Sequence, residues 1–107
     1  MSDPFMEQRK KEVENNKIVV YAKGTKDQPQ CGFSATAIQV FKVLGKPFEV
    51  INVLADPELF DRLDEFSGWP TFPQVFVNGK LVGGCDITVE MYESGELQKL
   101  VDAAFAA

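Results

Sequence analysis

Apolar residues occur along the chain in two patterns: short continuous runs, and longer segments in which they recur about every third position. Segments of the two kinds alternate. The run from Ile18 to Tyr21 is apolar throughout, rich in β-branched residues and too short for a helix, so it predicts a buried strand. From Cys31 onward the apolar residues recur at every third position, which predicts a helix with one buried face that ends at Gly45. Residues 24–30 connect the two segments and predict a loop.

Asn78-Gly79 is the strongest turn signal in the chain. These two residue types tolerate the positive φ angles that a tight hairpin requires, and residues 74–77 and 80–82 flank them as candidate strands. A β-hairpin is therefore predicted over residues 74–82. Residues 48–53 predict the one remaining strand.

Aspartate followed by proline marks the start of two further helices, because Asp caps a helix and Pro fits its first turn. Asp3-Pro4 opens a helix that extends to about residue 15, and Asp56-Pro57 opens one that extends to about residue 66. Asp86 and Ser94 are interpreted as caps of two final helical segments.

This order of elements predicts an α/β fold in a single domain over residues 1–107, a length that suits one hydrophobic core. A strand, a helix and a second strand imply a parallel pair with a right-handed crossover, and the hairpin adds an antiparallel pair. The expected architecture is a mixed four-stranded sheet flanked by helices, a thioredoxin-like layout. In such folds a proline placed like Pro73 follows a cis peptide bond, although an ordinary trans turn proline is the alternative.

Composition and charge exclude several function classes. The net charge is -5, so neither nucleic acid nor an anionic membrane surface is expected as a partner. The chain has no histidine, which excludes a Ser-His-Asp or Cys-His catalytic pair and an imidazole ligand to a metal. Two cysteines in a chain of this size indicate a reducing compartment, the cytoplasm of a bacterial-type cell or alternatively an organellar matrix.

The segment Cys31-Gly32-Phe33-Ser34 carries the candidate chemistry. Cys31 stands at the predicted start of a helix, where the helix dipole and unpaired N–H groups favour a thiolate. Ser34 stands where a dithiol oxidoreductase has its second cysteine, and a serine cannot resolve a mixed disulfide. Any reaction of Cys31 therefore needs a sulfur from elsewhere. A buried, inert thiol is the alternative for Cys31, and its place directly after the loop disfavours it.

Several motifs together resemble those of the monothiol glutaredoxin family of the CGFS type. In chain order the matching segments are Lys23-Gly24, residues 28–34, residues 69–74, residues 77–79 and residues 83–86. The resemblance extends from about Ile18 to about Leu100. It implies a thioredoxin-like domain that binds glutathione and, as a homodimer, holds a [2Fe-2S] cluster ligated by two protein thiolates and two glutathione thiols.

The resemblance implies that Cys31 is both the reactive thiol and the cluster ligand. The implied glutathione-binding residues are Lys23, Gln28, Thr71, Phe72, Pro73, Gly84, Cys85 and Asp86. Among these, Lys23 and Gln28 would face the glycyl carboxylate, and the backbone of Phe72 would pair with the extended ligand. The amides from Gly84 onward would hold the γ-glutamyl carboxylate, with Asp86 taking its ammonium group. A solvated surface lysine is the alternative interpretation of Lys23.

Two positions depart from the family pattern. Phe60 stands where these proteins usually carry an arginine for the glycyl carboxylate, and Asp64 replaces a lysine that often precedes the tryptophan motif. Arg62 lies about 200° around the helix from Phe60 and is not expected to substitute. We therefore expect weaker glutathione binding, or binding that depends on Lys23 and on backbone groups.

Cys85 has two interpretations. It is either a second redox thiol, which forms a disulfide with Cys31 or takes up glutathione, or a packed thiol that serves the turn.

Three function classes are compatible with the sequence. The first is a carrier that assembles a cluster and transfers it to apo iron-sulfur proteins, and the second is an enzyme that removes glutathione from protein thiols. The third is an adaptor for a BolA-like protein, which would supply the missing histidine ligand. The resemblance favours the carrier, since CGFS-type members are poor general reductants, and weak thiol transfer is the alternative.

Overall fold

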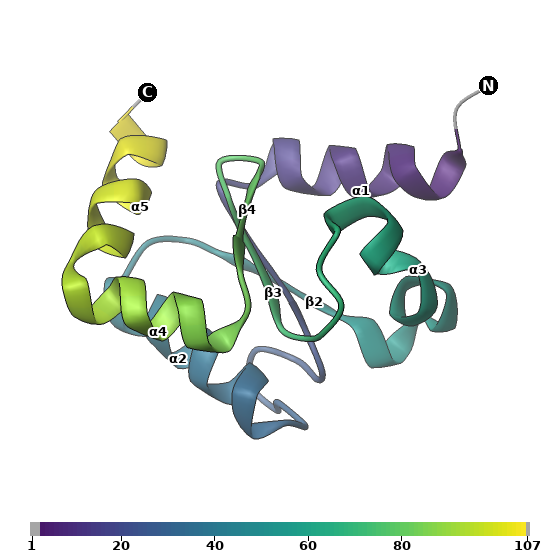
Figure 1. The fold of residues 1–107 in the computed structure, drawn as a ribbon, viewed down its shortest axis with the longest axis horizontal. Coiled ribbons are helices and arrows are strands. Elements are labelled where there is room, and N and C mark those ends of the chain that lie inside the picture. Colours follow the sequence, from purple (N-terminus) through teal and green to yellow (C-terminus); the bar gives the residue numbers. More distant parts are fainter. Residues whose placement is uncertain (1–2, 107) are drawn as a thin grey trace.

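The structure is a computed structural model that describes residues 3–106, and its centre is a four-stranded sheet with the order β2-β1-β3-β4 (Figure 1). The strands are β1 (Ile18–Ala22), β2 (Glu49–Asn52), β3 (Gln74–Val77) and β4 (Lys80–Gly83). The helices are α1 (Pro4–Asn15), α2 (Gly32–Leu44), α3 (Pro57–Ser67), α4 (Cys85–Ser94) and α5 (Glu96–Ala106), with a short 3-10 helix η1 (Val53–Ala55). Within residues 3–106 no helix has the length and apolar character needed to cross a bilayer.

Strand pairing confirms the mixed sheet that the sequence predicts. β1 and β2 are parallel and are connected through α2, whereas β3 is antiparallel to both β1 and β4. The hairpin between β3 and β4 turns at Asn78 and Gly79, whose φ angles are +53° and +79°. Both residues thus adopt the left-handed conformation that suits a two-residue hairpin.

Both faces of the sheet are covered by helices, which explains why β1 is apolar along its whole length and buried at every residue. Ile18 and Val20 face the layer that contains α2, α4 and α5, and Val19 and Tyr21 face the layer that contains α1 and α3 (Figure 1). In α3 the apolar residues Leu59 and Leu63 are both buried on one face, as their spacing of four predicts.

Several element boundaries differ from the prediction. The second strand begins at Glu49 and ends at Asn52, because the Asn52 side chain accepts the N–H of Leu54 and starts η1 instead. Asp86 is not an N-cap: the cap of α4 is Gly84, and Asp86 is an exposed residue of the first turn. Ser94 ends α4, and its hydroxyl accepts the N–H of Glu96 at the start of α5.

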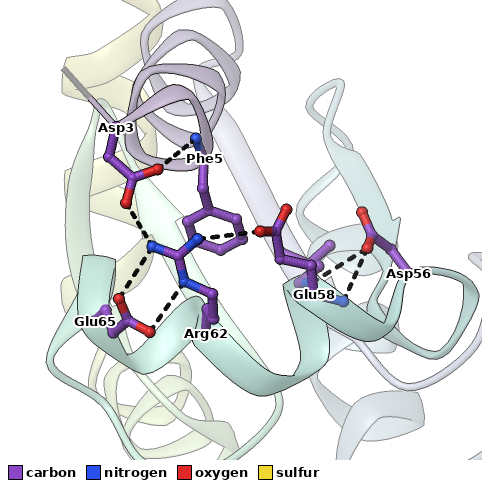
Figure 2. A network of polar contacts seen from close by, with 7 residues as sticks. Asp3, Phe5, Asp56, Glu58, Arg62 and Glu65 are labelled. Atoms are coloured by element: carbon purple, nitrogen blue, oxygen red, sulfur yellow. Dashed lines mark hydrogen bonds and ion pairs between the residues drawn. The ribbon is translucent and has the colours of Figure 1, made fainter.

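Arg62 joins α1 to α3 through a network of ion pairs (Figure 2). Its guanidinium pairs with Asp3, the N-cap of α1, and with Glu58 and Glu65 on α3. It also lies 4.6 Å from the centroid of the Phe5 ring. The hydrogen bond from Arg62 lowers the pKa of Asp3. These contacts hold Arg62 at the interface between α1 and α3. This agrees with the expectation that Arg62 does not take the place of the arginine that the family usually has at position 60.

Candidate functional site

Cys31 lies in an open cleft of about 610 Å³ at one end of the sheet. The chain segments that meet there are the end of β1, the start of α2, the middle of α3, the segment before β3 and the start of α4. The lining residues are Lys23, Cys31, Phe33, Phe60, Pro70, Thr71, Phe72, Cys85 and Asp86. The fold therefore brings residues that are distant in the sequence around one thiol.

Cys31 is the N-cap residue of α2 and is partly exposed. Its pKa lies below the usual value for a cysteine thiol, chiefly because the backbone N–H groups of Ser34 and Phe33 stabilise the thiolate. The positive charge of Lys23 and the hydroxyl of Ser34 act in the same direction, and burial opposes them. A helix start thus produces a nucleophilic sulfur without a histidine.

Cys85 is the first residue of α4 and the second thiol of the cleft. Burial raises its pKa, and the negative charges of Asp86 and of the Cys31 thiolate raise it further. The two free thiols therefore have pKa shifts of opposite sign although they line the same cleft.

This difference predicts an order of chemical labelling. Near neutral pH a larger fraction of Cys31 than of Cys85 is thiolate, so iodoacetamide is expected to modify Cys31 first, by at least about tenfold in rate. Peptide mass spectrometry after timed labelling between pH 5 and 10 gives the labelling rate of each thiol as a function of pH, and the pH of half-maximal rate is its midpoint. The Cys31 midpoint is expected at the lower pH, and equal midpoints would show that the helix start does not activate it.

Ser34 has a structural role that the sequence analysis missed. Its side chain is fully buried, and its Oγ accepts the backbone N–H of Lys23 at 3.0 Å. This hydrogen bond attaches the end of β1 to the first turn of α2 and so places Lys23 near Cys31. Position 34 is therefore part of the support beneath the cleft rather than of its lining.

The loop between β1 and α2 is folded tightly back on itself. Gly24 and Pro29 form an isolated β-bridge, and the N–H of Gln30 donates to the carbonyl of Lys23 at 2.8 Å. Asn52 fixes the loop from the neighbouring strand, since its Oδ1 accepts the N–H of Gly24 at 2.9 Å. The loop thereby returns the chain from Lys23 to Cys31 over a short span.

Six of the predicted site residues lie together in the cleft lining, and three do not. Those in the lining are Lys23, Cys31, Thr71, Phe72, Cys85 and Asp86. Gln28 is exposed on the loop outside the lining, and Pro73 is buried behind Phe72 after a cis peptide bond. Gly84 is buried against Trp69, where an added Cβ would lie 3.1 Å from the indole Nε1. Its missing side chain therefore permits close packing of the protein itself.

Phe60 is one of three aromatic residues in the cleft, together with Phe33 and Phe72. Phe60 and Phe72 are in contact, with ring centroids 5.3 Å apart, and Lys23 Nζ lies 5.9 Å from the centroid of Phe60. Phe33 is 63% exposed on the first turn of α2. Sequence reasoning noted Phe60 as a substitution but assigned no contact to it or to Phe33. Because an aromatic residue is ordinarily assigned to the core, no sequence signal identified Phe33 and Phe60 as cleft-lining residues.

Comparison with known proteins relates the chain to one family over most of its length. The family model described as glutaredoxin matches residues 18–82. A protein named "Probable monothiol glutaredoxin 2" from Rickettsia conorii is 54% identical over 92 residues, which cover 86% of each chain. An "Uncharacterized monothiol glutaredoxin ycf64-like" from Synechocystis is 52% identical over 92 residues, with the same coverage.

Solved structures show the same fold. The solution structure of reduced poplar apo GrxS14 superposes with a TM-score of 0.85 at 50% identity and covers 96% of this chain and 94% of its own. A holo form of glutaredoxin C1 from Populus tremula x tremuloides has a TM-score of 0.83 at 28% identity, with coverage of 95% and 90%. A buckwheat glutaredoxin-glutathione complex has a TM-score of 0.83 at 26% identity, with coverage of 94% and 90%.

Proposed function

The chain belongs to the monothiol glutaredoxin family, with a thioredoxin-like fold, and from this premise we propose that it binds a glutathione-ligated [2Fe-2S] cluster and delivers it to apo iron-sulfur proteins. Two copies of the chain would share the cluster, each supplying Cys31. The protein would act in a reducing compartment such as the cytoplasm.

The partly exposed, low-pKa thiol of Cys31 is the observation that carries this proposal. Thiolates are the soft ligands that iron-sulfur clusters require, and a ligand must be deprotonated before it binds. Cys31 supplies the sulfur, its lowered pKa favours the thiolate, and it opens onto a cleft that has room for a second thiol from a small molecule. The donor set therefore fits the cluster, which is cargo here and supplies its own redox chemistry to the recipient.

The surroundings of Cys31 support glutathione as the external thiol. Lys23 offers a positive charge to a carboxylate, and α4 begins at the cleft, where the N–H groups of a helix start would favour an anion. Thr71 and Phe72 also line the cleft, and their backbone would offer an edge for an extended peptide. The related buckwheat protein was solved as a glutathione complex, and the related poplar C1 protein as a holo form.

Anaerobic reconstitution tests the proposal. Reduced protein is incubated with ferrous iron and sulfide, with or without glutathione, and is then analysed by visible absorption and size-exclusion chromatography. We expect a coloured dimer that forms only with glutathione, because each chain contributes a single low-pKa thiol. A monomer that stays colourless in the presence of glutathione would contradict the carrier function.

Protein deglutathionylation is the second candidate, and the nucleophilic Cys31 favours it. The thiolate would attack the glutathione sulfur of a protein mixed disulfide, so that the protein leaves as a thiol and Cys31 becomes glutathionylated. A second glutathione would then attack that sulfur and release glutathione disulfide and free Cys31. A colourless monomer that turns over a glutathionylated peptide would support this function instead.

Replacing Lys23 by alanine is expected to weaken glutathione binding by about three- to tenfold, because a partly exposed charge pair is lost. Calorimetric titration of glutathione into the Cys31→Ser protein measures binding without thiol exchange. Lys80→Ala is the matched control, since it removes the same charge from the exposed hairpin outside the cleft. Equal affinities for the Lys23 and Lys80 variants would show that Lys23 does not contact the ligand.

A further inference from the structure

A groove between α2 and α4 lies outside the cleft, in the layer that these two helices share (Figure 1). Its volume is about 510 Å³. Val43 and Tyr92 in its lining remain 57% and 38% exposed, although burial of both side chains would be favourable. Exposed apolar side chains that gather in a groove mark a surface that binds a partner.

The shape of the groove suits a helix. On the α2 side its lining extends from Ala35 to Val43, about 12 Å along the helix axis, or about two helical turns. Val40 lies between them, and Val89 and Tyr92 of α4 form the facing side. A helix laid in such a groove would contact it with apolar residues spaced three and four apart.

The α4 side of the groove is acidic. Asp86, Glu90 and Glu93 are exposed and follow one another at helical spacing, so they form one line along α4, next to Val89 and Tyr92. Glu93 itself lines the groove. Among the side chains of residues 3–106, none of these three carboxylates has an ion-pair partner. Their charge is therefore available to a cation from another molecule.

No cation of the neighbouring chain segments balances this charge. Residues 81–98 contain four carboxylate side chains and neither lysine nor arginine. Lys42 is the one charged residue of α2, and it lies outside the groove lining. A second copy of this chain has a net charge of -5, so like charges would oppose its binding here, as they would oppose an anionic membrane. The charge instead favours a partner with lysine or arginine beside its apolar face.

We propose that the groove between α2 and α4 docks a basic amphipathic helix of a partner protein. The groove begins at Ala35, about one helical turn after Cys31, and shares no lining residue with the cleft. The docked partner thus lies beside the cleft without filling it. Under the proposed function this partner is a protein that receives the cluster, a role that rests on that function, whereas the docking itself does not.

Two synthetic peptides test the docking. The first consists of leucine and lysine over about four helical turns, with its leucines on one face, and the second has glutamate in place of every lysine. Each is labelled with fluorescein and titrated with reduced, cluster-free protein, and binding is followed by fluorescence anisotropy. We expect the lysine peptide to bind at least about tenfold more tightly than the glutamate peptide. In NMR spectra of isotope-labelled protein, the largest amide shifts are expected along the groove.

A cation placed in the groove should weaken this binding. Val43→Arg is expected to reduce the affinity for the lysine peptide by at least about tenfold, because it removes an apolar contact and repels the lysines. Leu54→Arg is the matched control, since it adds the same charge at an exposed apolar residue of η1, outside the groove. Its affinity is expected to stay within about twofold of the unsubstituted protein.

The acidic line is tested by removing two charges. Glu90→Gln combined with Glu93→Gln is expected to weaken the lysine peptide by about three- to tenfold and to reduce the salt dependence of its binding. Glu7→Gln combined with Glu14→Gln is the matched control, because it changes the net charge equally on α1, in the opposite layer. This control is expected to bind nearly as the unsubstituted protein does.

Three outcomes would overturn the proposal. They are equal affinity for the two peptides, amide shifts that lie outside the groove, and equal losses for Val43→Arg and Leu54→Arg. A dimer of the cluster-free protein that Val43→Arg abolishes in size-exclusion chromatography would assign the groove to a second copy instead. Because every measurement uses protein without a cluster, the reconstitution experiment judges the proposed function separately.

Discussion

Replacing Cys31 by serine is expected to abolish cluster assembly, with no visible absorption and no dimer after anaerobic reconstitution with glutathione. A serine hydroxyl remains protonated at neutral pH and is a hard oxygen ligand, so it cannot replace a thiolate on iron. Phe33 and Ser34 present their N–H groups to the sulfur, and in the variant these groups meet a neutral hydroxyl. The measurement is iron and sulfide bound per chain, combined with size-exclusion chromatography.

Cys85→Ser provides the comparison for this result. It removes the other thiol of the same cleft and preserves the backbone N–H at the start of α4. Because burial raises the pKa of Cys85, little of it is thiolate at neutral pH, and most of the cluster is expected to remain. Loss of the cluster in both variants, together with cluster assembly in the unsubstituted protein that does not depend on glutathione, would show that each chain supplies two ligands and would contradict glutathione as a ligand.

The sheet was predictable because its sequence signals are local. The apolar run of β1 indicated a strand buried on both faces, and Asn78-Gly79 fixed the hairpin. The caps at Asp3 and Asp56 were also confirmed, since each side chain accepts N–H groups of the first helical turn. Asp86 was wrong as a cap, because Gly84 is the N-cap and α4 starts at Cys85, two residues before the start that a cap at Asp86 would give.

The sulfur chemistry of the site and most of the cleft-lining residues were predictable from the sequence, but the contact of Phe60 with Phe72 was not. The position of Cys31 at a helix start follows from the chain order alone, and so does its lowered pKa. The contact between Phe60 and Phe72 joins α3 to the segment before β3, and only tertiary packing brings these two together. The burial of Ser34 was missed for a similar reason, because a serine in a reactive motif suggests exposure rather than support.

Gly24→Ala is expected to lower the free energy of unfolding by about 3 to 4 kcal/mol, the largest stability effect of a single methyl group that we expect in this chain. Gly24 has a φ of +106°, which L side chains rarely adopt. An added Cβ would lie 2.6 Å from both the carbonyl oxygen of Gln28 and the nitrogen of Gln30. Because both are backbone atoms, the loop itself must move. Urea denaturation followed by circular dichroism measures the change.

Gly45→Ala separates backbone strain from steric overlap. Gly45 also has a positive φ, +78°, but an added Cβ would meet no atom within 4 Å. Strain alone is therefore expected to cost about 1 kcal/mol there. The Gly24 variant is also expected to change the reactivity of Cys31. The displaced loop includes Gln30, the residue before Cys31, whose N–H donates to the carbonyl of Lys23. Its Cys31 alkylation midpoint should rise toward the usual cysteine value, whereas that of Gly45→Ala should not. Equal destabilisation of the two variants would show that the loop of residues 24–30 accommodates the extra methyl group. This loop would then not be a rigid support for Cys31.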